Sequence, residues 1–138
     1  MVIGIGTDLV EVERIRRIIG KWGERFLKRV FTAGEIAYCE RRRIPSVHYA
    51  ARFAAKESCL KSLGAGFGMG VSPAEIEVKR NAEGSPMLQL HGRAQRIFDG
   101  KGGEVVHISL SHTREIAAAV VVIEARGREH WRHRTDRN

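Results

Sequence analysis

The chain carries two acidic residues, Asp8 and Glu57, whose sequence surroundings suggest chemistry. Asp8 follows Gly4 and Gly6 at alternate positions of an apolar segment over residues 2–10, so one face of a predicted strand carries only glycines and a carboxylate. Glycines weaken a strand, and their usual explanation is a bend or the close approach of a backbone or a ligand. The pattern therefore fits either a ligand site at Asp8 or a bend at which Asp8 caps the following helix.

Glu57 occurs on a predicted helix together with Lys61, which follows one turn later. At about 100° per residue, both charged side chains fall within the apolar stripe that Phe53, Ala54 and Leu60 form. An unpaired charge in such a stripe is strongly unfavourable, so it needs compensation. One interpretation is an ion pair on a partly exposed helix, worth about 0.2–0.5 kcal/mol. The other is a carboxylate and an ammonium group that line a site for a metal, a phosphate or both.

The helix that carries Glu57 is expected to begin after Pro45 breaks the chain, with Ser46 as its N-cap. It is expected to run to about Leu63 and to end at Gly64. Hydrophobic periodicity and turn residues predict the other elements. They are a strand over 2–10, a helix with Val12, Ile15, Ile19 and Trp22 at helical spacing, a helix over 33–42 that begins with a capping box at Thr32 and Glu35, strands over 75–79 and 86–90, a helix over 92–99, and strands over 104–111 and 116–123. Strands interspersed with helices indicate an α+β domain.

Two further segments offer hydrogen-bond donors that suit a phosphate. Four glycines at alternate positions over 64–70 leave backbone N–H groups accessible. This segment lacks the strand and helix of a P-loop or a dinucleotide-binding fingerprint, and a flexible linker is the alternative. The last predicted hairpin turns through Ser111, His112, Thr113 and Arg114, which bring donors to one strand end. An ordinary surface histidine is the alternative at His112.

The overall composition indicates one small domain with an acidic partner. A chain of 138 residues suits a single core, and 43% hydrophobic content is ordinary for a soluble protein. Two cysteines are too few for a disulfide framework or a zinc site. No apolar run approaches about 18 residues and no signal-peptide pattern occurs, so a cytoplasmic location is expected. The net charge of +8 favours nucleic acid, a phosphorylated small molecule or an acidic protein as the partner.

Basic residues gather in two parts of the chain. Arg14, Arg16, Arg17 and Lys21 form a basic edge on the first predicted helix, shortly after Asp8. Most such runs are solvated helix faces, which is the alternative to a docking surface. The segment 125–138 is rich in arginine and poor in apolar residues, so it is expected to be poorly ordered.

Three segments, in this order, resemble those of the holo-acyl-carrier-protein synthases, the small single-domain class of phosphopantetheinyl transferases. They are Gly4-Ile-Gly-Thr-Asp8, Arg52-Phe-Ala-Ala-Lys-Glu57 with Lys61, and Ile108-Ser-Leu-Ser-His-Thr113. Three ordered blocks are far more specific than one glycine-aspartate motif. The likeness implies a phosphopantetheinyl transferase domain over 1–124, with an antiparallel sheet packed against a long central helix, and a separate basic tail over 125–138.

The resemblance implies transfer of the 4′-phosphopantetheine group from coenzyme A to a serine of apo acyl carrier protein, with release of adenosine 3′,5′-bisphosphate. Asp8 and Glu57 would hold Mg²⁺, and Lys61 would act on the transferring phosphate or on the proton of the attacking hydroxyl. Mg²⁺ binds oxygen ligands, typically one or two carboxylates with phosphates and water, which suits two acids without a His or Cys cluster. The residues implied to contact coenzyme A are Arg52, Lys56, Gly64, Gly66, Gly68, Pro86, Ser111, His112 and Thr113.

The resemblance also implies partners and a setting in fatty acid biosynthesis. Acyl carrier proteins are acidic, so Arg14, Arg17 and Lys21 are expected to dock the carrier. A homotrimer with active sites between subunits is expected, without a nucleic-acid or membrane partner. The competing hypothesis is a small basic nucleic-acid-binding domain, motivated by the net charge. That hypothesis explains Asp8 and Glu57 badly, because acids that face phosphates without a metal repel them.

Overall fold

The structure is a computed structural model that describes residues 1–65 and 69–126. It combines helices with antiparallel sheets in the α+β class that the sequence predicts. Its elements are, in chain order, β1 (Val2–Glu11), α1 (Val12–Trp22), α2 (Glu24–Val30), α3 (Ala33–Glu40), α4 (Pro45–Ser62), a short 3₁₀ helix (Pro73–Glu75), β2 (Ile76–Arg80), β3 (Pro86–Leu90), α5 (Gly92–Gly100), β4 (Gly103–His112) and β5 (Ile116–Ala125).

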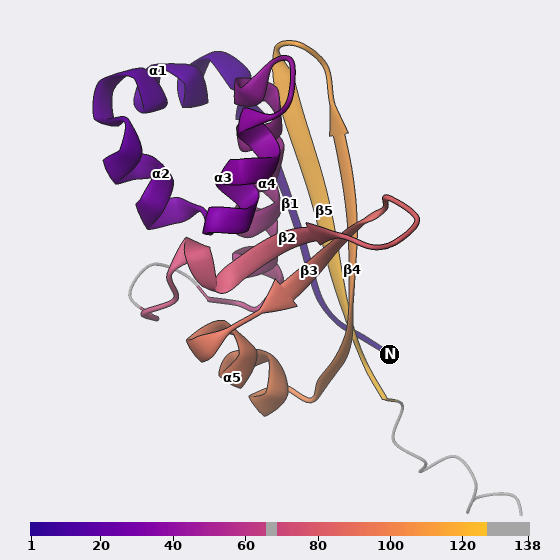
Figure 1. Cartoon of the computed structure of the whole chain (residues 1–138). Helices are drawn as coiled ribbons and strands as arrows, with labels where there is room; N and C mark the ends of the chain where they lie inside the picture. Colours follow the sequence, from indigo (N-terminus) through magenta and orange to yellow (C-terminus); the bar gives the residue numbers. More distant parts are fainter. Residues whose placement is uncertain (66–68, 127–138) are drawn as a thin grey trace, which may run out of the picture.

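The main sheet has the strand order β1–β5–β4, and its neighbouring strands are antiparallel. Asp8 on β1 pairs with Ala119 on β5, and His112 on β4 pairs with Ala117. Paired residues project to the same face of a sheet, and both alanines are buried. Asp8 and His112 therefore lie on the face that α4 covers, and Figure 1 shows α1, α2 and α3 beyond α4 on that side.

The sequence predicts the C-terminal end of α4 correctly but not its N-terminal end. Pro45 is the first helical residue and Ile44 is the N-cap, so the prediction that Pro45 breaks the chain and that Ser46 is the N-cap is wrong. Proline suits the first position of a helix because an N–H there would have no partner within the helix. At the other end, Gly64 has φ +66°, the left-handed conformation that commonly ends a helix.

The burial of α4 corrects the predicted apolar stripe. The sheet packs on one side of α4, while α3 and β2 contact it on another, so most of the helix is buried. Arg52 and Lys56, which lie outside the predicted stripe, are the buried charges. Glu57 and Lys61 lie at the edge that remains partly open. The helix is enclosed from more than one side, and its alanines allow that close packing, so no single stripe defines its buried face.

The remaining predictions agree with the structure except for one added helix. Thr32 and Glu35 form the predicted capping box at the start of α3. All the predicted strands are present, and β2 pairs with β3 as a hairpin. The helix α2, which follows α1 after Gly23 at φ +54°, was not predicted. Among the described residues, no helix is both long and apolar enough to cross a membrane. The tail that was expected to be poorly ordered lies outside the described residues from residue 127 on.

Candidate active site

Lys61 joins the first and second sequence blocks. Its Nζ lies 3.2 Å from Oδ1 of Asp8 and donates a hydrogen bond to the carbonyl oxygen of Thr7 at 2.9 Å. The side chains of Asp8 and Lys61 are 20% and 56% exposed, so a ligand can reach the pair from solvent. Two residues that stand 53 positions apart in the chain therefore meet beside β1.

Glu57 faces the same group of charges. Burial raises the pKa of the Glu57 carboxyl most, the Asp8 carboxylate raises it further, and Lys61 and Arg14 lower it. The Asp8 carboxylate disfavours ionisation of Glu57 because two negative charges repel, and a cation between the two side chains would relieve that repulsion. We call Asp8, Glu57 and Lys61 the acidic site, with Arg14 at its border.

Gly4 and Gly6 allow β1 to lie directly against α4. A Cβ atom at Gly6 would overlap the carbonyl oxygen of Ser58, and a Cβ atom at Gly4 would overlap that of Ser62. The close approach of another backbone, one of the explanations that the sequence offers, therefore accounts for these glycines. This packing fixes Asp8 on β1 relative to the acidic-site residues on α4.

Gly6→Ala is expected to lower the free energy of unfolding by about 2–3 kcal/mol, because the added methyl group separates β1 from α4. Urea unfolding followed by circular dichroism measures the change. Gly20→Ala in α1 is the matched control, since nothing lies within 4 Å of a Cβ atom there. The control should raise stability by up to about 1 kcal/mol. Equal stability of the two variants would contradict the importance of the contact at Gly6.

The acidic site fits the ligand preference of Mg²⁺. This ion is typically held by one or two carboxylates, and water and substrate phosphates supply its other oxygen ligands. Residues 1–65 and 69–126 contain no group of three or more His, Cys, Asp or Glu that could hold a metal. A metal at Asp8 and Glu57 would therefore need oxygen atoms from water or a substrate, as a site for phosphate chemistry requires.

Lys56 is fully buried, which corrects the expectation that it contacts coenzyme A. Its Nζ donates to Oε1 of Glu35 at 2.8 Å and to the carbonyl oxygens of Pro73 and Ile76 at 3.0 and 2.6 Å. These acceptors account for the three N–H bonds of the ammonium group. Glu35 also accepts a hydrogen bond from the backbone N–H of Val78. Lys56 therefore joins α4 to α3 and β2, and it offers no donor to a ligand.

Arg52 is 2% exposed, yet it forms no ion pair within residues 1–65 and 69–126. Its guanidinium carbon lies 3.9 Å from the centroid of the Tyr38 ring, and its Nε has no hydrogen-bond partner among the described residues. Arg42 and Arg80 approach the same ring at 4.3 and 5.1 Å. We call Arg42, Arg52 and Arg80, together with Tyr38, the arginine cluster.

The residues expected to bind phosphate at the end of β4 point in different directions. His112 faces His48 of α4, and their ring centroids are 5.6 Å apart. Ser111 lies on the opposite face of the sheet, because successive side chains of a strand alternate. The Thr113 hydroxyl accepts hydrogen bonds from two backbone N–H groups of the β4–β5 turn. Within one chain, the structure therefore does not bring the side chains of Ser111 and His112 together.

The other residues expected to contact coenzyme A are described only in part. Gly64 ends α4, whereas Gly66 and Gly68 lie outside the described residues. Pro86 begins β3 and pairs with Arg80 on β2. Pro86 therefore borders the arginine cluster.

Helices α1 and α2 present a basic surface with exposed apolar side chains. Arg14, Arg17 and Lys21 line a shallow hollow together with Ile18 and Trp22. Trp22 is 51% exposed, although its helical spacing predicts burial, because α1 ends at Trp22. The adjoining hollow is lined by Ile18, Trp22, Arg25, Phe26 and Arg29. We call the residues of both hollows the α1–α2 surface; its α2 members were missed because α2 itself was not predicted.

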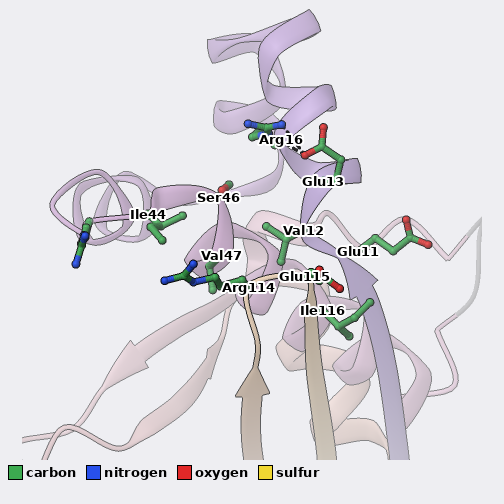
Figure 2. Close-up of a pocket in the computed structure, with 11 residues that line it drawn as sticks. Glu11, Val12, Glu13, Arg16, Ile44, Ser46, Val47, Arg114, Glu115 and Ile116 are labelled. Carbon is green, nitrogen blue, oxygen red and sulfur yellow. Dashed lines mark hydrogen bonds and ion pairs between the residues drawn. The ribbon is translucent and has the colours of Figure 1, made fainter.

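A larger hollow lies where the starts of α1 and α4 meet the β4–β5 turn (Figure 2). Arg16 and Glu13 form an ion pair at its border, with Nη2 and Oε2 2.7 Å apart. The hollow shares four lining residues with a smaller one beside His48 and His112, namely Arg43, Ile44, Val47 and Arg114. The sequence contains no sign of this larger hollow, because three segments that are distant in the chain form it.

Comparisons with known proteins agree on one family. The family model described as the 4′-phosphopantetheinyl transferase superfamily matches residues 4–121. The holo-[acyl-carrier-protein] synthase of Syntrophus aciditrophicus is 52% identical over 124 residues, which are 90% of this chain and 97% of that relative.

Solved structures lead to the same family. The crystal structure of the Neisseria meningitidis holo-[acyl-carrier-protein] synthase has a TM-score of 0.82 and 33% identity, over 90% of this chain and 99% of that one. The Helicobacter pylori synthase, solved in complex with coenzyme A, has a TM-score of 0.76 and 30% identity, over 87% of this chain and 99% of that one. Sequence and fold thus agree over most of the chain, which belongs to the 4′-phosphopantetheinyl transferase superfamily and, within it, to the holo-[acyl-carrier-protein] synthases.

Proposed function

We propose that this chain transfers the 4′-phosphopantetheine group of coenzyme A to a serine of apo acyl carrier protein, with Mg²⁺, and releases adenosine 3′,5′-bisphosphate. The serine oxygen bonds to the phosphorus next to pantetheine, and the P–O bond from that phosphorus to the bridging oxygen breaks. The bridging oxygen leaves with adenosine 3′,5′-bisphosphate, and the serine proton passes to water. The observation that carries the proposal is the acidic site, where Lys61 and Asp8 meet beside Glu57. Relatives solved with coenzyme A support the choice of donor.

The three residues of the acidic site have distinct tasks in this proposal. Asp8 and Glu57 would hold the metal, which when bound would neutralise charge on the pyrophosphate oxygens. Lys61 donates hydrogen bonds to Asp8 and to the Thr7 carbonyl, as an ammonium group does. We therefore assign Lys61 to electrostatic stabilisation of the transferring phosphate rather than to proton abstraction from the serine.

Intact mass spectrometry of the carrier tests the proposal. The purified chain, incubated with apo acyl carrier protein, coenzyme A and Mg²⁺, should add one phosphopantetheine group per carrier and release an equal amount of adenosine 3′,5′-bisphosphate. A chelator should stop the reaction. An unmodified carrier under these conditions would contradict the proposal. Salt-sensitive nucleic-acid binding that survives Glu57→Ala and needs no Mg²⁺ would favour the competing hypothesis instead.

We propose that residues 1–124 form the catalytic domain. We also propose that the protein acts in the cytoplasm, within fatty acid biosynthesis. The family model ends at residue 121, before the basic segment 125–138 begins. We therefore propose that transfer does not require this segment.

The α1–α2 surface is the proposed docking site for the acidic carrier. Arg14 borders the acidic site, because it is one of the charges that lower the pKa of Glu57. A carrier bound along α1 would therefore present its serine close to Lys61. Trp22, with Lys21 5.2 Å from its ring centroid, adds exposed apolar area to the positive charge. Mixed basic and aromatic surfaces of this kind favour protein partners.

Arg17→Glu and Lys21→Glu are each expected to raise KM for the carrier about tenfold, with little change in KM for coenzyme A, because charge complementarity chiefly affects carrier association. Steady-state kinetics with each substrate varied in turn measures both constants. Arg96→Glu on α5 is the matched control, with the same charge change at another exposed arginine. We avoid Arg14→Glu, which also alters the charges around Glu57. An unchanged carrier KM in both α1 variants would remove α1 from the docking site.

We extend the proposal to a homotrimer formed through the outward face of the main sheet. The apolar side chains of Ile5, Leu9, Val105 and Val120 are 40–72% exposed there. Such a face is rarely left open to water in a stable monomer. The acidic site borders β1, so a second subunit on this face would lie near it.

Leu9→Glu is expected to convert the assembly to monomers, because Leu9 is 72% exposed in the single chain and a charge there would be buried by a partner. Light scattering after size-exclusion chromatography measures the mass. Met87→Glu on β3 places the same charge at an exposed apolar residue outside this face and should leave the mass unchanged. A monomeric unmodified chain would contradict the proposed assembly.

A further inference from the structure

The outward face of the main sheet has an apolar part and a polar part. Ile5 and Leu9 on β1 expose apolar side chains there. On β4 alternate residues share this face, and three successive ones are polar, namely His107, Ser109 and Ser111. A second subunit packed on the outward face would therefore cover an imidazole and two hydroxyl groups as well as apolar side chains.

His107 and Glu124 form an ion pair within the polar part. Nε2 of His107 lies 3.2 Å from Oε1 of Glu124 on β5, and the two side chains are 54% and 46% exposed in the single chain. His107 pairs with Val122, which in turn pairs with Ile5 on β1, so an apolar row continues across the sheet from the imidazole. Water reaches both charged groups in the single chain, and a partner subunit over this row would exclude it.

The charge that faces His107 comes from Glu124, since Asp8 lies on the opposite face of the sheet. The other charged groups of the described strands and their turn lie near strand ends. They are Glu11 on β1, Glu104 on β4, which is paired with Arg126 beyond β5, Arg114 and Glu115 in the β4–β5 turn, and the N-terminal ammonium group, which donates to the carbonyl oxygen of Ala125. The charge of the polar part therefore depends on His107 and Glu124.

Burial by a partner would favour the protonated form of this pair. With a neutral imidazole the pair carries one negative charge, and with a protonated imidazole its charges cancel. An uncompensated charge costs more to bury than an ion pair whose members stay in contact. Assembly would therefore take up a proton on His107, within the range of about pH 5–8 where imidazole groups change charge. By linkage, the trimer becomes more stable as the pH falls through this range.

We infer that the His107–Glu124 pair makes the assembly of this chain with its own copies proton-dependent, so that the trimer tightens as the pH falls and loosens as the pH rises. The inference rests on the homotrimer of the proposed function. The net charge acts in the opposite sense, because each chain already carries +8 and further protonation adds repulsion between subunits. Tighter assembly at lower pH would therefore not come from net charge.

Sedimentation of the full chain, with a dye at its C-terminus, over a series of dilutions at about pH 6, 7 and 8 tests the inference. The concentration at which half of the trimer dissociates should rise at least about threefold per pH unit, since one proton per subunit would change it up to about thirtyfold. If the trimer stays intact at every dilution, subunit exchange between two differently labelled samples should become faster as the pH rises.

The result also separates this inference from the proposed assembly and activity. A trimer whose dissociation and exchange do not depend on pH would overturn the inference alone. A chain that is monomeric at every concentration and pH would contradict the homotrimer, and with it the inference. Carrier modification is measured separately, so neither result bears on the proposed transfer of phosphopantetheine.

Two variants test the pair itself, and both replace side chains that are about half exposed in the single chain. His107→Gln removes the titrating group, so its assembly should lose this pH dependence. Glu124→Gln should reverse the dependence, because a protonated His107 would then be buried without a counter-charge. Retention of the original dependence by His107→Gln would overturn the inference.

His91→Gln is the matched control. Nε2 of His91 lies 3.0 Å from Oε1 of Glu77, so the chain contains a second histidine–glutamate pair of similar geometry. His91 follows β3 and lies outside the main sheet, so this variant should keep the pH dependence of the unmodified trimer. Loss of the dependence in His91→Gln would overturn its assignment to His107.

Discussion

Asp8→Asn and Glu57→Gln are each expected to lower kcat/KM for carrier modification at least about a hundredfold. A metal at a phosphoryl site stabilises the transition state by several kcal/mol, and each factor of ten corresponds to about 1.4 kcal/mol. Both changes keep the size of the side chain and remove one of the two carboxylates beside Lys61. The carrier mass assay under single-turnover conditions measures the loss. Near-normal transfer by either variant would contradict the assignment of its carboxylate to the metal.

The stability of Glu57→Gln separates this effect from misfolding. Burial and Asp8 raise the pKa of Glu57 above its value in the unfolded chain. The ionised carboxylate therefore destabilises the fold at a pH above the raised pKa, and the cost disappears as the pH falls through it. Without metal, Glu57→Gln should melt at a higher temperature than the unmodified chain at neutral pH, and this difference should shrink in acid. A large loss of stability would contradict this account of the acidic site.

Lys56→Ala and Glu35→Ala are each expected to lower the free energy of unfolding by about 3–5 kcal/mol, because each leaves the other charge buried without its partner. Both side chains are fully buried and their charged atoms lie 2.8 Å apart. The double variant Lys56→Met with Glu35→Leu should lower the free energy of unfolding by less than the sum of the two single decreases, because neither buried charge remains. Urea unfolding of the four proteins gives the coupling energy.

Lys28→Ala is the matched control for the buried pair. Lys28 and Glu24 form an exposed ion pair on α2, with Nζ and Oε2 3.3 Å apart. Loss of this exposed ion pair should lower the free energy of unfolding by at most about 1 kcal/mol. If Lys56→Ala is as mild as Lys28→Ala, the buried pair does not hold α3 and β2 to α4.

Local sequence signals predicted most of the elements because each depends on neighbouring residues. The capping box at Thr32 and Glu35 predicted α3, and alternating apolar residues predicted the strands. The glycines Gly4 and Gly6 indicated a close approach at β1, and the structure identifies the neighbour as the backbone of α4. The sequence could not name that neighbour, because it belongs to a segment about 50 residues away.

The errors share a physical cause, which is that burial depends on tertiary packing. Lys56 was expected to contact coenzyme A, but α3 and β2 enclose it and Glu35 neutralises it. Trp22 has the spacing of a buried residue, yet it is exposed at the end of α1. The resemblance to a known family indicated that Asp8 and Glu57 act together. Helical periodicity alone could not decide between that site and an ordinary ion pair of Glu57 with Lys61. The arginine cluster has no sequence motif, since its members come from separate elements.

Direct measurement of metal binding tests the central claim, that Asp8 and Glu57 share one divalent cation. Mn²⁺ serves as a paramagnetic substitute for Mg²⁺, and electron paramagnetic resonance counts the free ion during titration of the protein with coenzyme A present. The unmodified chain should bind one Mn²⁺ per active site, Mg²⁺ should displace it, and Asp8→Asn and Glu57→Gln should each weaken binding at least about tenfold. Unchanged Mn²⁺ affinity in both variants would contradict the claim.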